Sequence, residues 1–195
     1  MSRIRHALAP AALSLAIATA AAGEGPAIGT DAPEIRLTTL DGKPFVLSEA
    51  ARSRNGVVVM FIATKCPYSN AYNDRMRDMA IAYEKQGVLF VGINSNNTEP
   101  AEEVATHARQ HGFTFPLMKD PGNKVADLYG AKHTPEIFVV DRSGKLRYHG
   151  RIDENYENAS QVNSPDLKNA LDAMVSSKPI ARAETKAFGC SIKRV

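Results

Sequence analysis

The sequence predicts an α/β sandwich in which helices flank a central mixed β-sheet. Two continuous apolar runs rich in β-branched residues, 57–63 and 88–94, are typical of strands buried on both faces. Each is followed by a segment with helical character, 69–86 and 99–111, that ends at a glycine. A second hairpin pattern covers 136–151. Strand–helix–strand units followed by a hairpin and a helix indicate a mixed sheet with a helical layer.

The remaining elements are shorter and rest on turn and cap signals. Asp41-Gly42 is a turn pair between two strand-like segments, which predicts an N-terminal β-hairpin. Ser48 is a suitable cap for the short helix that follows. The expected minor elements are the hairpin at 35–47, helices at 48–54, 123–129 and 165–176, and a strand at 115–118.

Composition fits a single domain and excludes several classes of protein. The chain has 195 residues, 2 cysteines and a formal net charge of +3. That charge is too small to indicate nucleic acid as a partner. Two cysteines are too few for a disulfide-dense scaffold or a four-cysteine zinc site. The chain also has no phosphate-binding loop, dinucleotide glycine pattern or Ser/His/Asp signature, so we expect neither a cofactor nor a metal.

Residues 1–22 have the three parts of a secretory signal. Arg3 and Arg5 form a short basic start, an apolar run follows, and small residues lead to Ala22. We therefore expect an exported protein, periplasmic or secreted, that works where disulfides persist. A retained membrane anchor is the alternative, although the run is short and alanine-rich for a span. Nothing later in the chain is apolar for long enough to cross a membrane.

These patterns divide the chain into four segments. We expect a signal peptide at 1–22, a Gly- and Pro-rich N-terminal arm at 23–33, a domain at 34–176 and a basic C-terminal tail at 177–195. Removing the signal takes away two arginines and no acid, so Lys+Arg falls from 24 to 22 against 21 acids. The basic composition therefore says little about partners of the mature chain.

The first cysteine lies where a buried strand meets a helix. Cys66 follows the strand at 57–63, and Pro67 suits the first helical turn because its missing N–H costs nothing there. Free backbone N–H groups and the helix dipole stabilise a thiolate at this place, and Lys65 adds positive charge nearby. The thiolate is the reactive form of cysteine. The alternative is a cysteine that packs as a small buried hydrophobic residue.

The stretch Cys66-Pro67-Tyr68-Ser69 resembles the active-site motif of the thioredoxin superfamily, and the resemblance covers most of 30–176. It implies a thioredoxin-like three-layer sandwich. The family motif is Cys-x-x-Cys, so Ser69 replaces the second cysteine and the usual local disulfide cannot form. Thr134-Pro135 matches the family's cis-proline, which lies against the active-site cysteine and receives extended substrates. An ordinary turn proline at Pro135 is the alternative.

Five short motifs resemble the peroxiredoxin-like branch of that superfamily more closely. These redoxin-domain proteins are related to alkyl hydroperoxide reductase and thiol-specific antioxidant enzymes. The five motifs in register are Thr64–Ser69, Gly92–Asn96, Thr134–Glu136, Gly150–Asp153 and Gly189–Lys193. Together they are far more specific than a single Cys-Pro pair.

The resemblance implies a thiol–disulfide oxidoreductase that uses Cys66 as its nucleophile. Pro67, Ser69, Thr134 and Pro135 would surround the thiol and receive the partner. The expected partners are protein or small-molecule disulfides and thiols. Exchange needs only a thiolate of low pKa, access and a groove for the partner.

Two other functions remain open. The active-site motif of peroxiredoxins is Pro-x-x-x-Thr-x-x-Cys. In this sequence Val59 and Ala63 occupy the positions of that Pro and Thr. A thiol peroxidase with peroxide as substrate is therefore the first alternative, with Thr64 one residue from the expected place. The second is a non-catalytic binding module that holds a fixed Cys66–Cys190 disulfide or a copper(I) ion at Cys66.

The second cysteine, Cys190, stands on the basic tail. If the tail folds back, Cys190 could resolve a mixed disulfide or a sulfenic acid on Cys66. A static disulfide that pins the tail and two independent thiols are the other possibilities. Gly189 would permit the tight turn that presents the thiol.

Three further sets of polar residues have both a functional and a purely structural interpretation. Glu103, His107 and His111 lie four residues apart on one helix, but a solvated face is a better interpretation than a metal site. Asn94 and its neighbours follow a buried strand and could donate hydrogen bonds near Cys66, or form only a turn. Glu136 could relay protons from the thiol, but an exposed edge position is the safer expectation.

Overall fold

The computed structural model describes residues 25–195, so the predicted signal peptide lies outside the described residues. A five-stranded sheet with the order β5-β4-β3-β7-β8 forms the centre of the fold. Within this sheet β3, β4 and β5 are parallel and come first in the chain. The later strands β7 and β8 are antiparallel and add to the other side of β3. The strands are β3 (Gly56–Phe61), β4 (Val88–Asn94), β5 (Leu117–Lys119), β7 (Glu136–Asp141) and β8 (Leu146–Gly150).

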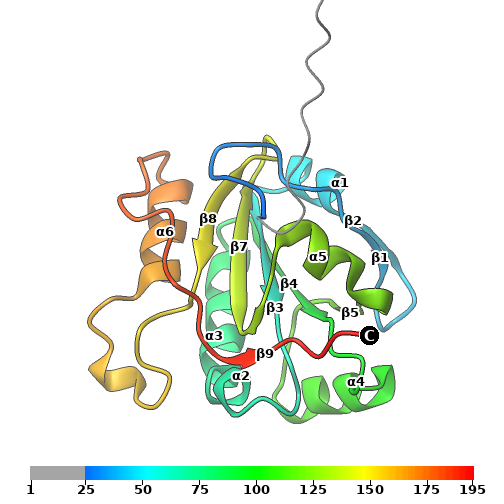
Figure 1. The fold of residues 1–195 in the computed structure, drawn as a ribbon. Helices are drawn as coiled ribbons and strands as arrows, with labels where there is room; N and C mark the ends of the chain where they lie inside the picture. The colour runs from blue at the N-terminus through cyan, green and yellow to red at the C-terminus, as the bar shows by residue number, and fades with distance from the viewer. Residues whose placement is uncertain (1–24) are drawn as a thin grey trace, which may run out of the picture.

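Side chains of β3 alternate between two apolar cores, although the strand is apolar at nearly every position. Val58 and Met60 face the core that α3 (Asn73–Glu84), α6 (Asp166–Val175) and Val104 of α4 (Ala101–Gln110) complete. The odd-numbered residues of β3 face a second core under α1 (Leu47–Arg52) and α5 (Lys124–Tyr129). Figure 1 shows α5 in front of the sheet and α3 behind it. The predicted sandwich of a mixed sheet between helical layers is confirmed.

The N-terminal hairpin is formed by β1 (Arg36–Thr38) and β2 (Pro44–Val46), as predicted. Gly42 in its turn has φ +84°, a left-handed conformation that glycine adopts without strain. The hairpin is a separate two-stranded sheet, and it contributes the buried Phe45 to the second core.

The helix expected at 69–86 is in fact two helices with an earlier start. Helix α2 (Pro67–Ala71) begins directly after Cys66, and α3 follows after Tyr72. Tyr72 is buried, and its hydroxyl donates to Asp153 Oδ1 at 2.8 Å. This hydrogen bond lies at the junction of the two helices. The start at Pro67 agrees with the preference of proline for the first helical position.

The C-terminal tail is packed against the rest of the fold. Its strand β9 (Cys190–Ser191) pairs antiparallel with β6 (His133–Thr134), and Ile192 is buried in the second core. Figure 1 shows the tail, in red, crossing the molecule between α2 and α5. Short 3₁₀ turns lie at Pro121–Asn123 and Ala159–Gln161.

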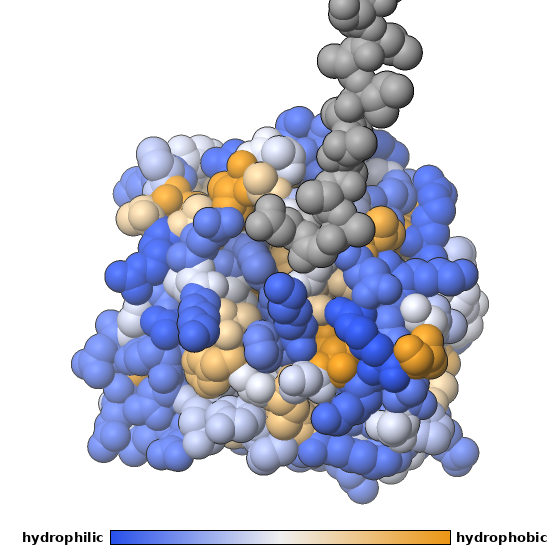
Figure 2. All heavy atoms as spheres, viewed as in Figure 1, coloured by the Kyte–Doolittle hydropathy of each residue, from blue (hydrophilic) through white to orange (hydrophobic). Residues whose placement is uncertain are grey.

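The face over which the tail runs is mainly hydrophilic, with apolar residues in small separate groups (Figure 2). Within residues 25–195 no helix has the length and apolarity needed to cross a membrane.

Candidate active site

Cys66 is held at the point where β3 gives way to α2. It is the N-cap residue of α2, with extended backbone angles, and the Ser69 N–H donates to its sulfur at 3.4 Å. The Cys66 thiol donates in turn to the Thr134 carbonyl at 3.1 Å. Only 2% of the residue is exposed. The sulfur therefore lies between the helix N-terminus and the segment that precedes β7.

Ser69 supports this corner through two different groups. Its backbone N–H reaches the sulfur, whereas its hydroxyl oxygen accepts from the Ala63 N–H at 3.2 Å. Ser69 is buried, so its side chain ties the end of the strand to the first turn of α2. The hydroxyl thus has a structural partner away from the thiol.

The Thr134–Pro135 peptide bond is cis, and both residues are buried. This geometry turns the Thr134 carbonyl toward Cys66 Sγ. Pro135 follows β6 directly and leads into β7, the neighbour of β3. The two segments singled out from the sequence, around Cys66 and around Thr134-Pro135, therefore meet at the thiol.

The tail brings the second cysteine to the same place. Cys190 is the β-pairing partner of Thr134, the residue that accepts the Cys66 thiol hydrogen bond. Gly189 has φ +142°, and a Cβ on it would lie 2.1 Å from the Thr134 carbonyl oxygen. Only glycine permits this close approach. Both cysteines are free thiols in the structure, Cys66 buried and Cys190 half-buried.

The two thiols differ in acidity, and burial and the contact between them both contribute. Burial raises the pKa of the Cys66 thiol, but hydrogen bonding from the Cys190 thiol, the Thr134 side chain and the Ser69 N–H outweighs burial. The net pKa of Cys66 lies below the ordinary cysteine value. Burial and the neighbouring Cys66 raise the pKa of Cys190 to about 11. Cys66 is therefore the more acidic thiol of the pair.

Comparison with known proteins places this geometry in a family. The family model for AhpC/TSA proteins matches residues 28–149, which include Cys66 and the cis Thr134–Pro135 bond. This chain belongs to the AhpC/TSA family. The thiol-disulfide oxidoreductase ResA of Geobacillus thermodenitrificans strain NG80-2 is 31% identical over 121 residues, which cover 62% of this chain and 67% of that protein. The enzyme class expected from the sequence is the one that this relative carries in its name.

Two solved structures have the same architecture. A hypothetical protein from Sinorhizobium meliloti 1021 has a TM-score of 0.80 at 32% identity, covering 88% of this chain and 97% of that one. A thiol:disulfide interchange protein of the thioredoxin family from Chlorobium tepidum TLS has a TM-score of 0.61 at 23% identity, covering 77% and 99%. The second likeness concerns the fold alone. The thioredoxin-like fold predicted from the sequence is confirmed.

The AhpC/TSA match ends at residue 149, so Cys190 lies beyond the part that it covers. An aromatic cluster packs this tail against the start of α2. The rings of Tyr68 and Tyr156 are 4.5 Å apart between centroids, and Phe188 lies 6.2 Å from each. Tyr68 is two residues after Cys66, and Phe188 is two residues before Cys190. No local sequence pattern signals this cluster, because its members are far apart in the chain.

The asparagines at and after the end of β4 lie beside the Cys66 loop but do not bind the thiol. Asn94 and Asn96 donate instead to the carboxylate of Glu99, which also accepts from the Thr64 and Lys65 N–H groups. Glu99 was not among the residues singled out from the sequence, although a carboxylate soon after a buried, asparagine-rich strand end is a recognisable signal.

The expectation that Glu136 occupies an exposed edge is wrong. Its side chain is buried because β7 is an inner strand between β3 and β8. The carboxylate accepts from the Lys132 and His133 N–H groups and pairs with His149 Nε2 at 2.7 Å. Burial raises the pKa of Glu136, but these hydrogen bonds outweigh it and the net pKa is lowered. Glu136 thus fixes the backbone that enters the cis bond.

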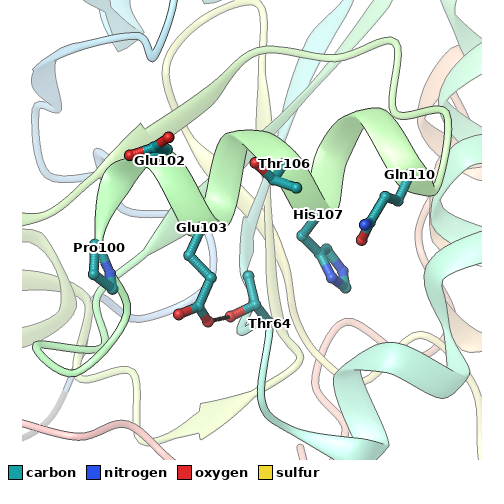
Figure 3. A pocket seen from close by; sticks show the side chains of 7 residues that line it. All are labelled: Thr64, Pro100, Glu102, Glu103, Thr106, His107 and Gln110. Atoms are coloured by element: carbon teal, nitrogen blue, oxygen red, sulfur yellow. Dashed lines mark hydrogen bonds between the residues drawn. The ribbon is translucent and has the colours of Figure 1, made fainter.

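The helix face that carries Glu103 and His107 lines an open groove of about 550 Å³ beside Thr64 (Figure 3). Thr64 Oγ1 donates to Glu103 Oε1 at 2.6 Å. His107 packs against His111, with ring centroids 4.3 Å apart. In the part of the chain that the structure describes, no group of three His, Cys, Asp or Glu residues is arranged to hold a metal ion.

Proposed function

We propose that this protein is an exported thiol–disulfide oxidoreductase in which Cys66 is the nucleophile and Cys190 the resolving cysteine. The observation that carries the proposal is the pairing of Cys190 with Thr134, directly beside the Cys66 sulfur. The lowered pKa of Cys66 favours the thiolate, the form that attacks disulfides. The name of the ResA relative supports the same reaction.

The first step joins Cys66 to the partner. The Cys66 thiolate attacks one sulfur of a partner disulfide, a Cys66–partner disulfide forms, and the other partner sulfur leaves as a thiolate that takes up a proton. The Ser69 N–H and the N-terminus of α2 stabilise the attacking sulfur before this step. Pro135 and the Thr134 backbone receive the chain around the partner sulfur.

The second step releases the partner. Cys190 loses its proton and attacks Cys66 Sγ, the Cys66–Cys190 disulfide forms, and the remaining partner sulfur leaves as a thiolate. The negative charge on Cys66 contributes to the raised pKa of Cys190. That charge disappears in the mixed disulfide, so Cys190 becomes more acidic when it is needed. The partner gains two electrons, and an external thiol reductant later returns them to the protein.

Cys66 is too buried for a folded partner to reach it directly in this state. The strand β9 occupies the edge of β6 beside the cis-proline, where an extended partner segment would pair. We therefore include in the proposal a displacement of residues 189–191 when a partner binds. The expected signal peptide at 1–22, the arm at 23–33 and the domain at 34–176 complete the proposed organisation.

Disulfide exchange is a better proposal than peroxide reduction. Ala63 and Val59 stand where peroxiredoxins have their Thr and Pro, and the Thr64 hydroxyl donates to Glu103 rather than to the Cys66 sulfur. No hydroxyl at the threonine position of that motif is thus available to orient a peroxide.

The proposal is tested by the reduction of a protein disulfide substrate such as insulin with dithiothreitol as the reductant. We expect the wild type to accelerate the reaction, Cys66→Ser to be inactive, and Cys190→Ser to accumulate a mixed disulfide on Cys66. Activity of Cys66→Ser equal to the wild type would overturn the role of Cys66. Rapid, selective oxidation of Cys66 by hydrogen peroxide without disulfide reductase activity would support the peroxidase instead.

A further inference from the structure

Glu99 is a buried carboxylate whose two oxygens each accept two hydrogen bonds. Oε2 accepts from the Thr64 N–H at 2.8 Å and from Asn94 Nδ2 at 2.5 Å. Oε1 accepts from the Lys65 N–H at 3.1 Å and from Asn96 Nδ2 at 2.9 Å. The residue is 1% exposed, and a charge buried to that degree requires such full pairing. Burial raises the pKa of Glu99, but these donors outweigh it and the net pKa is lowered.

Two of the four donors belong to the Cys66 loop. Thr64 and Lys65 are the residues immediately before Cys66, and both offer their backbone N–H groups to the same carboxylate. Since a backbone N–H cannot rotate independently of the chain, this contact fixes the path along which the chain enters α2. The position of Cys66 Sγ depends on that path.

A third donor connects the same carboxylate to the tail. Asn96 donates to Glu99 through Nδ2 and accepts from the Lys193 N–H through Oδ1 at 2.7 Å. The Asn97 N–H donates to the Lys193 carbonyl at 2.9 Å, so the tail makes hydrogen bonds on both sides of Lys193. Lys193 is three residues after Cys190. Asn96 and Asn97, which follow β4, thus hold the part of the tail that lies next to Cys190.

Lys119 also binds the segment that follows β4. Its ammonium group donates to Asn94 Oδ1, to the Asn96 carbonyl at 2.7 Å and to the Glu99 carbonyl at 2.6 Å. All three contacts go to the segment that carries Glu99 and Asn96. Burial lowers the pKa of Lys119, and the negative charge of Glu99 partly counters that lowering.

We infer that Glu99 and Asn96 are positioning residues of the thiol pair, because one hydrogen-bonded unit holds both the chain before Cys66 and the chain after Cys190. This inference rests on the proposed function and identifies what keeps the resolving cysteine within reach. Two groups on one rigid support have a high effective concentration with respect to each other. Loss of these hydrogen bonds lowers that effective concentration without altering either cysteine.

Glu99→Gln is a sharp test because all four partners of the carboxylate are donors. An amide nitrogen in place of either oxygen meets two N–H groups and accepts neither, so no rotamer satisfies the network. The measurement is the equilibrium constant of the Cys66–Cys190 disulfide against glutathione. We expect a fall of about tenfold or more from the lost effective concentration.

Asp166→Asn is the matched control. Asp166 is also buried, but its hydrogen bonds go to Arg151, Ser164 and Arg182. We expect this variant to lose stability while its disulfide equilibrium constant stays within twofold of the wild type. An equal fall in both variants would reduce the role of Glu99 to general stability and overturn the inference.

Hydrogen exchange separates the positioning role from the reaction. In Glu99→Gln, amide exchange should become faster at Thr64, Lys65 and Lys193 together. In Asn96→Ala, it should become faster at Lys193 and stay unchanged at Thr64. Asn96→Ala carries the test alone if Glu99→Gln does not fold. Unchanged exchange and an unchanged equilibrium constant in Asn96→Ala would overturn the inference. A wild type that forms no Cys66–Cys190 disulfide would defeat the proposed function, while hydrogen exchange would still test the network.

Discussion

Cys190 lies opposite Thr134 in the pairing of β9 with β6, and the Thr134 carbonyl accepts the hydrogen bond of the Cys66 thiol. One residue beside a cis-proline thus contacts both cysteine-bearing segments. The tail occupies the edge that the resemblance to thioredoxins assigns to an extended partner. The second thiol is therefore delivered from the far end of the chain rather than from the next turn of α2.

The first prediction concerns the acidity of the two thiols. The wild type should titrate in two steps. The pKa of Cys66 should lie below the ordinary cysteine value, and that of Cys190 should be about 11. Cys190→Ala removes the hydrogen bond from Cys190, so the pKa of Cys66 should rise. Ultraviolet absorbance of the thiolate then reports Cys66 alone, since the chain has 2 cysteines.

The control for this titration is Cys190→Ser, which keeps a hydroxyl donor. Its Cys66 pKa should lie between those of the wild type and Cys190→Ala. A Cys66 pKa in Cys190→Ala equal to that of the wild type would show that Cys190 does not stabilise the thiolate.

The second prediction concerns Gly189, where a side chain has no room. Gly189→Ala places a Cβ 2.1 Å from the Thr134 carbonyl oxygen, so β9 must move away from β6. We expect the Cys66–Cys190 disulfide to form at least about tenfold more slowly, because Cys190 loses its position over the site. Alkylation of Cys66 by iodoacetamide should become faster, because the sulfur loses its cover.

Gly144→Ala is the matched control for backbone strain. Gly144 has φ +83°, but a Cβ there has nothing within 4 Å. This variant should lose about 1 kcal/mol of unfolding free energy from the left-handed conformation and keep the wild-type rate of disulfide formation. Equal rates in Gly189→Ala and the wild type would contradict the assigned role of the β6–β9 pairing.

The third prediction separates the two contributions of Ser69. Ser69→Ala leaves the Ala63 N–H without its buried acceptor, which should lower the unfolding free energy by about 1–3 kcal/mol in urea denaturation. The pKa of Cys66 should stay close to the wild-type value, because the contact to the sulfur comes from the Ser69 backbone. A large rise in that pKa would instead make the Ser69 hydroxyl a direct partner of the thiolate.

The fourth prediction is a pH dependence of stability at Glu136. Because the folded pKa of Glu136 is lowered, its carboxylate stabilises the fold above its ordinary pKa, and that stability is lost as the pH falls through the folded value. Glu136→Gln should therefore cost about 1–3 kcal/mol at neutral pH and progressively less in acid. Chemical denaturation at several pH values measures the difference, and a cost that does not change with pH would contradict it.

Much of the architecture follows from local sequence signals. The apolar run at 57–63 and the turn pair Asp41-Gly42 predict a buried strand and a hairpin, and both are present as β3 and β1–β2. The break at Tyr72 could not be predicted in this way. It coincides with a hydrogen bond from the Tyr72 hydroxyl to Asp153, and nothing near Tyr72 in the sequence signals that partner.

In the candidate site too, some residues have a local sequence signal and others depend on long-range contacts. A cysteine before a proline at the start of a helix is a local signal, so Cys66 could be singled out from the sequence. The meeting of Cys66 with Cys190 depends on the path of the whole tail, and the burial of Glu136 depends on the strand order of the sheet. Glu99 follows an asparagine-rich strand end, which is a local signal, but its contacts with the Thr64 and Lys65 N–H groups join segments far apart in the chain.

The most direct measurement is disulfide mapping of the protein after one equivalent of oxidised glutathione. Free thiols are alkylated with one reagent, the sample is reduced and alkylated with a second, and peptides are identified by mass. We expect an intramolecular Cys66–Cys190 disulfide in the wild type that dithiothreitol opens reversibly, and glutathione retained on Cys66 in Cys190→Ser. Stable glutathione on Cys66 in the wild type, with Cys190 still free, would contradict it.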